Sequence, residues 1–303
     1  MAVSMVTMGD PGLTLSRIIP GLMRLFSWKL SREELTGWIQ ACYDMGLTTF
    51  DHADIYGGYQ IESTFGEALA AAPGLREKLQ LVTKCNIALV NPNRPQHRVH
   101  HYDSSRKHIL ESVENSLRNF QTDYLDLLLI HRLDALMDAD EVAETFHELR
   151  QAGKVRFFGV SNFTPSHHAL LQSRLDFPLA TNQIEFSVTH MQPLEDGTLD
   201  QCQQLRTPPM IWSPLGGGGL FTADDERSTR LRRTLEVIAD ELGGAGIDQV
   251  ALAWAMKHPS KPLPVLGTGK LDRIKAAVDA VDLQLDVQHW YMIWEASMGH
   301  EVP

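Results

Sequence analysis

The fold class of this chain is clearest in the run Tyr124-Leu125-Asp126-Leu127-Leu128-Leu129-Ile130-His131. After a polar start the run is almost unbroken in its apolar character, and it ends at a histidine. Strands that are buried on both faces have this pattern, and they are typical of parallel sheets covered by helices. The run therefore predicts a central strand of an α/β fold, with His131 at its carboxyl end.

Similar short apolar runs alternate with amphipathic segments on either side of this strand. Eight strands are expected at residues 18–22, 48–52, 79–83, 124–130, 155–160, 180–185, 210–213 and 264–266. Helices are expected at residues 31–45, 61–71, 104–120, 139–151, 165–174, 199–205, 247–257 and 271–280, with a further helix at 287–298 and an N-terminal hairpin at 3–15. The alternation predicts one (β/α)8 TIM barrel domain over residues 1–303, with an N-terminal β-hairpin and an extra C-terminal helix. An open doubly wound sheet is the alternative, and it is weakened because no G-x-G-x-x-G follows the first strand.

Two segments break this alternation. Residues 86–103 and 214–228 are rich in proline, histidine or glycine, and both are expected to be long loops. Loops of this length inside a compact domain are more often functional than accidental.

The charge and the cysteine content argue against several classes of protein, among them nucleic-acid-binding and disulfide-rich proteins. The 303-residue chain has 27 Lys and Arg against 38 Asp and Glu, a formal charge of −11, which argues against nucleic acid or an anionic membrane as a partner. Cys42, Cys85 and Cys202 are too widely spaced for a disulfide framework or a Cys-x-x-Cys pair. With no signal peptide or membrane span visible, we expect a cytoplasmic protein, and a monomer because no apolar stripe stands out.

Four polar residues end predicted strands or follow them closely: Asp51, Tyr56, Lys84 and His131. A tyrosine has a pKa of about 10, and a nearby ammonium such as that of Lys84 would lower this pKa and make a better acid. Asp51 would keep the lysine charged, and a neutral His131 would orient a carbonyl oxygen. Each residue alone is equally well explained as an ordinary strand-end or loop residue. Together, on the face where barrels carry their chemistry, they predict a proton donor to a carbonyl oxygen.

The order of the motifs resembles the aldo-keto reductase superfamily, and in particular its bacterial YdhF-like branch. The resemblance extends over about residues 21–273 and rests on six motifs: Phe50-Asp51-His52-Ala53-Asp54-Ile55-Tyr56-Gly57, Thr83-Lys84, Leu128-Leu129-Ile130-His131-Arg132, Gly159-Val160-Ser161-Asn162-Phe163, Asn182-Gln183-Ile184-Glu185, and Trp212-Ser213-Pro214-Leu215-Gly216-Gly217-Gly218. It implies an NAD(P)H-dependent carbonyl reductase on a TIM barrel. Tyr56 would be the proton donor, and Asp51, Lys84 and His131 would complete the catalytic tetrad.

The resemblance also implies the cofactor contacts. Ser161, Asn162 and Gln183 would hold the nicotinamide carboxamide, and Trp212 would stack on the nicotinamide ring. Ordinary alternatives are helix capping by Ser161, a turn role for Asn162 and core packing by Trp212. The remaining cofactor-binding residues would be Met23, Asp51, Ser213, Pro214, Leu215, Gly217, Gly219, Thr268, Gly269, Lys270 and Arg273.

Two segments have the chemistry of phosphate sites. The glycines at 216–219 let backbone amides approach a pyrophosphate without obstruction by side chains. Lys270 and Arg273 lie three residues apart at an expected helix start, where cations oppose the macrodipole unless an anion lies among them. A 2′-phosphate fits, so NADPH (NADP) is favoured over NAD, and a pair of solvated surface cations is the alternative. The chain departs from the family pattern at Gly267, Ala276 and Ala277, where relatives often carry a lysine, an acidic residue and an asparagine.

Two other functions compete with carbonyl reduction. His97, His100, His101 and Asp103 are clustered in the 86–103 loop and would suit a metal-dependent hydrolase or lyase barrel, although no His-x-His pair ends a strand. A nucleotide-binding regulatory or sensor barrel with negligible turnover is the second. The substrate is expected to be a small-molecule carbonyl compound, with Phe26, Trp28, Tyr59 and the 86–103 loop as candidates for the pocket mouth.

Overall fold

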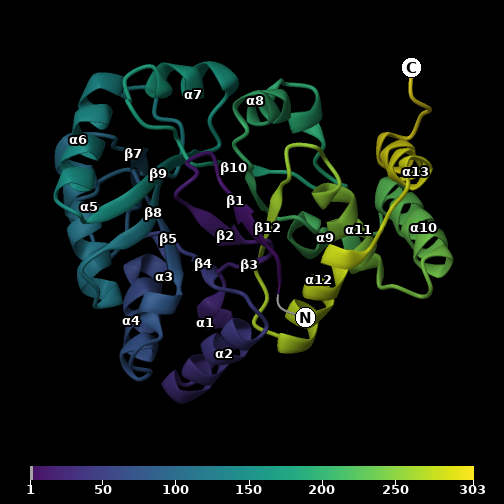
Figure 1. Ribbon diagram of the computed structural model, residues 1–303, viewed down its shortest axis with the longest axis horizontal. Coiled ribbons are helices and arrows are strands. Elements are labelled where there is room, and N and C mark those ends of the chain that lie inside the picture. The colour runs from purple at the N-terminus through teal and green to yellow at the C-terminus, as the bar shows by residue number, and fades with distance from the viewer. Residues whose placement is uncertain (1–2) are drawn as a thin grey trace.

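The computed structural model describes residues 3–303 and is a (β/α)8 barrel, as predicted (Figure 1). Eight strands form one parallel sheet in the order β3-β12-β11-β10-β9-β8-β5-β4. A parallel bridge between Gly21 and Asp51 closes the sheet, where the Leu22 N–H donates to the Asp51 carbonyl oxygen at 2.9 Å. The barrel strands are β3 (Ile19–Pro20), β4 (Thr49–Asp51), β5 (Gln80–Cys85), β8 (Leu125–Ile130), β9 (Val155–Ser161), β10 (Asn182–Glu185), β11 (Met210–Trp212) and β12 (Leu263–Leu266).

Helices surround the barrel in the predicted alternation, and the expected strands and helices are all present within a few residues of their predicted bounds. The longer helices are α2 (Arg32–Asp44), α4 (Ile61–Ala70), α5 (Arg106–Phe120), α6 (Ala139–Gln151), α7 (Pro165–Gln172), α8 (Thr198–Leu205), α10 (Glu226–Glu241), α11 (Ile247–Met256), α12 (Leu271–Asp279) and α13 (Val287–Met298). Short helices are α1 (Leu25–Trp28), α3 (Tyr56–Tyr59) and α9 (Gly219–Thr222), and 3-10 turns are η1 (Arg76–Lys78), η2 (Gln192–Leu194), η3 (Gly216–Gly218) and η4 (Ala280–Asp282). That the whole chain is one domain stays a prediction.

The helix α10 has no counterpart in the sequence-based expectation, which ended a loop at residue 228 and left 229–246 unassigned. Asp225 caps its N-terminus by accepting from the Ser228 N–H, and Leu231, Leu235 and Ile238 form its buried stripe. This i, i+4, i+7 spacing of apolar residues is typical of a helix, but the many charged residues around them obscure the pattern in the sequence. The helix packs against the C-terminal helix α13 beside the barrel (Figure 1).

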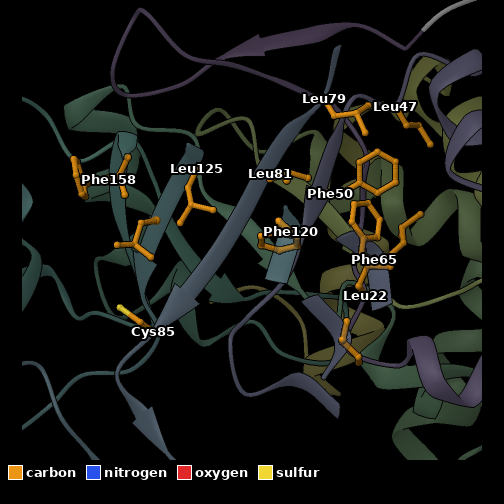
Figure 2. Close-up of a cluster of buried hydrophobic side chains, with 14 of the residues drawn as sticks. Leu22, Leu47, Phe50, Phe65, Leu79, Leu81, Cys85, Phe120, Leu125 and Phe158 are labelled. Atoms are coloured by element: carbon orange, nitrogen blue, oxygen red, sulfur yellow. The ribbon is translucent and has the colours of Figure 1, made fainter. Parts of the chain in front are cut away.

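The N-terminal hairpin closes one end of the barrel interior. Its strands β1 (Met5–Thr7) and β2 (Thr14–Ser16) pair antiparallel, as predicted. Leu15 is fully buried in a cluster with barrel residues that include Val82 and Leu127. Outside the barrel wall, aromatic side chains fill the space under α4 and α5: the rings of Phe50 and Phe65 lie 5.4 Å apart (Figure 2).

The loop at 86–103 is more regular than expected. It contains a short antiparallel hairpin of β6 (Ile87–Ala88) and β7 (His101–Tyr102). The second predicted loop, 214–228, holds η3, α9 and the start of α10. In the described part of the chain, no helix has the length and apolar character needed to span a bilayer.

His168 on α7 gives the fold a measurable pH dependence. Its side chain is buried, and burial lowers its pKa from 6.5 to about 4. The unfolded chain therefore binds a proton below pH 6.5 that the folded chain excludes, so stability falls as the pH drops from 6.5 toward 4. One histidine contributes a slope of about 1.4 kcal/mol per pH unit to the free energy of unfolding in this window.

We predict that His168→Leu removes this slope contribution in urea titrations between pH 6.5 and 4.5. His100→Leu, which replaces an exposed histidine, is the control and should keep the wild-type slope. Equal slopes for wild type and His168→Leu would contradict the prediction.

Candidate active site

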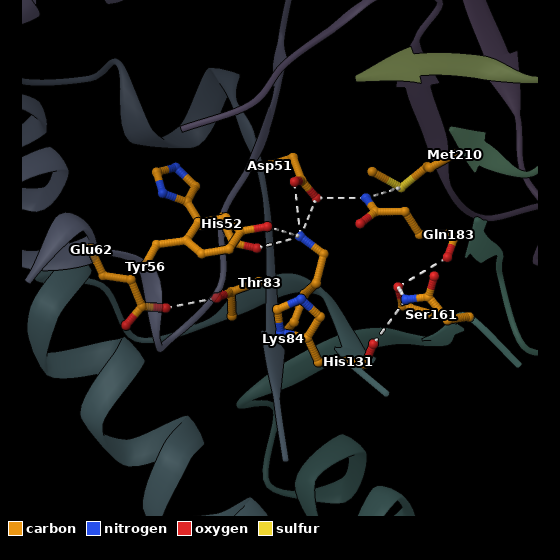
Figure 3. Close-up of polar contacts among 11 residues, drawn as sticks. Asp51, His52, Tyr56, Glu62, Thr83, Lys84, His131, Ser161, Gln183 and Met210 are labelled. Carbon is orange, nitrogen blue, oxygen red and sulfur yellow. Dashed lines mark hydrogen bonds and ion pairs between the residues drawn. The ribbon is translucent and has the colours of Figure 1, made fainter. Parts of the chain in front are cut away.

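A buried lysine lies at the centre of the candidate site (Figure 3). Lys84 on β5 is completely shielded from solvent, and its Nζ donates to both carboxylate oxygens of Asp51 at 2.8 Å. The same Nζ lies 2.7 Å from the His52 carbonyl oxygen and 3.3 Å from the Tyr56 hydroxyl. The structure thus places the predicted carboxylate, ammonium and phenol in one contact cluster.

Asp51 offsets the cost of burying this ammonium. Burial acts to lower the pKa of Lys84, whereas the charge and hydrogen bonds of Asp51 and the neighbouring Tyr56 act to raise it. The net pKa of Lys84 lies above its ordinary value, so the side chain is charged at neutral pH. The expected role of Asp51 toward the lysine is in accord with this geometry.

The pKa of Tyr56 shifts in the direction opposite to the expected one. Burial raises the pKa of Tyr56 above its ordinary value and outweighs the lowering by the Lys84 charge. Lys84 itself lowers the pKa of Tyr56, as expected, but the expectation took no account of the desolvation of the phenol, which has the larger effect. In the resting protein the hydroxyl is consequently fully protonated at neutral pH.

The local backbone explains where the Tyr56 ring lies. Tyr56 begins the short helix α3, and Gly57 and Gly58 follow it with φ values of 57° and 66°, a region that favours glycine. A Cβ at Gly57 would lie 2.5 Å from the Phe26 ring, so a larger residue would displace that contact. The two glycines therefore permit the turn that directs Tyr56 toward Lys84.

His131 joins the cluster directly after β8. Its ring centroid lies 6.0 Å from that of Tyr56, and burial, followed by the charge of Lys84, lowers the pKa of His131 well below its ordinary value. The imidazole is therefore neutral. Its Nδ1 is buried without a hydrogen-bond partner, a position that suits a lone pair better than an N–H. We infer that Nε2 carries the proton.

The residues expected to hold the nicotinamide are connected by hydrogen bonds beside this cluster. Asn162 Nδ2 donates to Ser161 Oγ at 2.8 Å and to the His131 carbonyl oxygen at 3.2 Å, while its Oδ1 accepts from Trp212 Nε1 at 3.0 Å. Gln183 Nε2 donates to Asp51 Oδ1 at 2.8 Å. Gln183 therefore also orients the carboxylate that holds Lys84, a contact that sequence reasoning missed.

The two expected phosphate segments lie at the ends of β11 and β12. After Ser213, which has a φ of 50°, Pro214 is buried and Leu215 packs partly against the core. Gly216, Gly217 and Gly218 all have positive φ, and no atom lies within 4 Å of a Cβ placed at Gly218 or Gly219. The backbone at Gly218 and Gly219 is thus not covered by side chains, but the N–H groups of Gly216 and Gly218 already donate to the carbonyl oxygens of Ser213 and Leu215, and that of Gly219 donates to Gly216.

The segment after β12 carries the predicted cations. Lys270 is the N-cap of α12, with its N–H donating to Thr268 Oγ1 at 3.2 Å, and Arg273 lies in the first turn. Both side chains are exposed, and within residues 3–303 neither forms an ion pair. Gly269 is required by packing, because a Cβ there would lie 2.4 Å from the Trp28 ring.

Arg24 links these two segments and was missed by sequence reasoning. Its Nη2 donates to the Gly217 carbonyl oxygen at 3.2 Å, and its side chain lies against Gly267. The preceding residue, Met23, was expected to contact the cofactor and is 56% exposed. The only signal for Arg24 in the sequence was its position next to Met23. Its contacts with Gly217 and Gly267 form only when the barrel closes and brings these segments together.

Two histidines of the 86–103 loop lie near each other, with the rings of His97 and His101 5.5 Å apart, but each ring has a backbone partner. His97 Nδ1 bonds the Leu89 carbonyl oxygen, and His101 Nδ1 bonds that of Val99. Among the described residues, no group of three or more His, Cys, Asp or Glu is arranged to hold a metal ion. The other mouth candidates have structural partners as well: the Tyr59 hydroxyl accepts from the Leu89 N–H at 2.8 Å, and the ring of Trp28 lies 4.9 Å from that of Trp38.

Comparison with known proteins agrees with this geometry. The model of the aldo/keto reductase family matches residues 17–297. The chain is 52% identical to the oxidoreductase YdhF of Escherichia coli (strain K12), covering 99% of this chain and all of that one. It is 51% identical to the uncharacterized oxidoreductase YcsN of Bacillus subtilis (strain 168) and 44% identical to a 6-dehydroglucose reductase of Agrobacterium fabrum; each match covers 96% of this chain and 97% of the relative.

Solved structures share the barrel. A thermostable aldo-keto reductase, Tm1743, crystallised with the inhibitor epalrestat, superposes with a TM-score of 0.80 at 25% identity, covering 97% of this chain and 100% of that one. A glycerol dehydrogenase from Gluconobacter oxydans superposes with a TM-score of 0.84 at 23% identity over 99% and 97% of the two chains, a likeness of fold alone.

Proposed function

This chain belongs to the aldo/keto reductase family and is an NAD(P)H-dependent oxidoreductase, and we propose that it reduces aldehydes or ketones with NADPH, with Tyr56 as the proton donor. The observation that carries this proposal is the fully buried Lys84 ammonium, 2.8 Å from the Asp51 carboxylate and 3.3 Å from the Tyr56 hydroxyl. The name of the Agrobacterium fabrum relative, 6-dehydroglucose reductase, supports reduction of a carbonyl group.

The raised pKa of Tyr56 and the nearby ammonium act at different stages. Burial keeps the phenol protonated before the reaction, so the proton is available at neutral pH. When the phenol releases its proton to the developing alkoxide, the Lys84 ammonium stabilises the phenolate that remains. Asp51 holds the Lys84 ammonium in place, and Gln183 in turn holds the Asp51 carboxylate.

The neutral His131 orients the substrate in this proposal. An Nε2–H donor beside Tyr56 hydrogen-bonds the carbonyl oxygen without competing as a stronger acid. The reduced cofactor, when bound, supplies the hydride that the carbonyl carbon accepts.

The donor groups of the chain fit that cofactor. Ser161, Asn162 and Gln183 offer hydroxyl and amide groups beside the tetrad, suited to a carboxamide. The backbone at Gly218 and Gly219 is open to the approach of a pyrophosphate, and the exposed Lys270 and Arg273 at the start of α12 suit a 2′-phosphate. We therefore propose NADPH over NADH. A monomeric, cytoplasmic enzyme acting on a small carbonyl compound stays a prediction.

We predict that Tyr56→Phe lowers kcat for a nitrobenzaldehyde by about 10²–10⁴-fold, because the proton donor is lost from the chemical step. The dissociation constant of NADPH, measured by fluorescence titration, should stay within about twofold of wild type. Tyr291→Phe alters an exposed tyrosine on α13 and should change neither quantity. Wild-type turnover in Tyr56→Phe would remove Tyr56 from its proposed role, and NADPH binding without turnover of a broad carbonyl panel by the wild type would favour a regulatory barrel.

Arg273→Ala should weaken NADPH binding by about tenfold or more, a loss of about 1.4 kcal/mol, while NADH binding changes much less. The difference arises because only NADPH carries the 2′-phosphate. Lys275→Ala on the same helix removes a cation that is already paired with Asp279 and serves as the control. Equal losses for NADPH and NADH would refute the assignment of Arg273 to the 2′-phosphate.

A further inference from the structure

A second cation lies beside the catalytic cluster and takes no part in the chemistry described above. Arg132 follows His131 directly after β8, and a fully buried asparagine fixes its backbone. Asn86 Oδ1 accepts from the Arg132 N–H at 3.0 Å, and Asn86 Nδ2 donates to the Arg132 carbonyl oxygen at 2.8 Å. Asn86 has a φ of 88°, an uncommon conformation for a non-glycine residue that indicates a constrained site. The position of Arg132 is therefore built into the structure.

The side chain of Arg132 reaches the Trp212 ring of the candidate cofactor site. Its guanidinium carbon lies 5.7 Å from the centroid of the Trp212 ring, within the range of a cation–π contact. Trp212 is joined through Asn162 to the His131 carbonyl oxygen. Burial dominates the pKa of both Tyr56 and His131, yet the charge of Arg132 also acts on each of them and lowers both.

The guanidinium has hydrogen-bond donors that the protein does not use. Within residues 3–303, Arg132 takes part in no ion pair, and its recorded hydrogen bonds involve only its backbone. The nearby Asp134 is committed to the backbone N–H groups of Ser104 and Leu136. By contrast, Arg76, in the turn before β5, is paired with Asp126 at 2.9 Å. A half-buried arginine without a carboxylate partner presents a planar fork of donors to a ligand.

We propose that Arg132 is a specificity-determining residue that binds an anionic group of the substrate, so that the preferred substrates are aldehydes or ketones carrying a carboxylate or a phosphate near the carbonyl. This inference rests on the proposed carbonyl reduction. A guanidinium pairs with either anion through two parallel hydrogen bonds. The chain has a formal charge of −11, which disfavours an anion elsewhere on the surface, so a local cation is needed to hold one at the site.

Two matched substrate pairs test this inference and distinguish the two anions. Succinic semialdehyde is compared with its methyl ester, and glyceraldehyde 3-phosphate is compared with glyceraldehyde, by following NADPH oxidation. We expect kcat/KM of the wild type to favour the charged member of at least one pair by tenfold or more. The pair that shows the preference identifies the anion. Turnover of the neutral members with no preference in either pair would overturn the inference and leave the proposed function intact, whereas no turnover of any of the four compounds would count against the proposed function itself.

Variants then assign the preference to Arg132. Arg132→Gln should lower kcat/KM for the charged substrate at least tenfold, mainly through KM, while the neutral member changes less than threefold. Arg132→Lys should restore part of the preference, which a purely structural role would not produce. Arg233→Gln, which removes one exposed charge from α10, is the control for net charge. Equal losses for both members of a pair, or a loss confined to NADPH affinity, would overturn the assignment.

Discussion

The buried ion pair between Lys84 and Asp51 is the interaction on which the rest of the site depends. An ammonium without access to water is stable only if a carboxylate and further acceptors surround it, and here Asp51 and the His52 carbonyl oxygen supply them. Asp51 is also the residue where the sheet closes, since its carbonyl oxygen accepts from Leu22. The backbone of Asp51 therefore helps to close the barrel, while its side chain keeps Lys84 charged.

This pair is better understood as a functional than as a stabilising device. Desolvation makes buried ion pairs weak contributors to stability. The functional importance of the Lys84–Asp51 pair lies in the positive charge that it places 3.3 Å from the Tyr56 hydroxyl. The surrounding backbone carries strain as well. Asn86, Asn162 and Ser213 have φ values of 88°, 58° and 50°, and all three follow barrel strands next to the cluster or are linked to it by hydrogen bonds. Strained conformations of non-glycine residues gather at functional sites in this way.

Much of this could be predicted from the sequence, because it depends on local patterns. Doubly buried strands such as β8 and amphipathic helices such as α5 leave clear periodicities, and the polar residues that end the strands must meet on one face of a barrel. The helix α10 escaped detection because its three buried apolar residues are surrounded by charged ones. Its contacts with α13 supply the stabilisation that the sequence pattern does not reveal.

The features that could not be predicted depend on tertiary packing and on contacts between residues that are distant in the sequence. The sign of the Tyr56 pKa shift follows from the competition between burial and the Lys84 charge, and burial of a side chain is set by tertiary packing. The contact of Gln183 with Asp51 joins residues 132 positions apart. Arg24 and Arg132 are ordinary in the sequence, and their importance appears only when the loops that they reach lie beside one another.

The most direct test of the central claim is a double-mutant cycle on the buried pair, with Lys84→Met, Asp51→Asn and the double variant compared by urea unfolding. We expect Lys84→Met to lower the free energy of unfolding by about 3–5 kcal/mol, because it leaves a buried carboxylate without its ion-pair partner. We expect the double variant to be destabilised by less than the sum of the two single variants, by at least about 1 kcal/mol. Additivity within about 0.5 kcal/mol would contradict the claim that Asp51 holds the charge of Lys84 in the core.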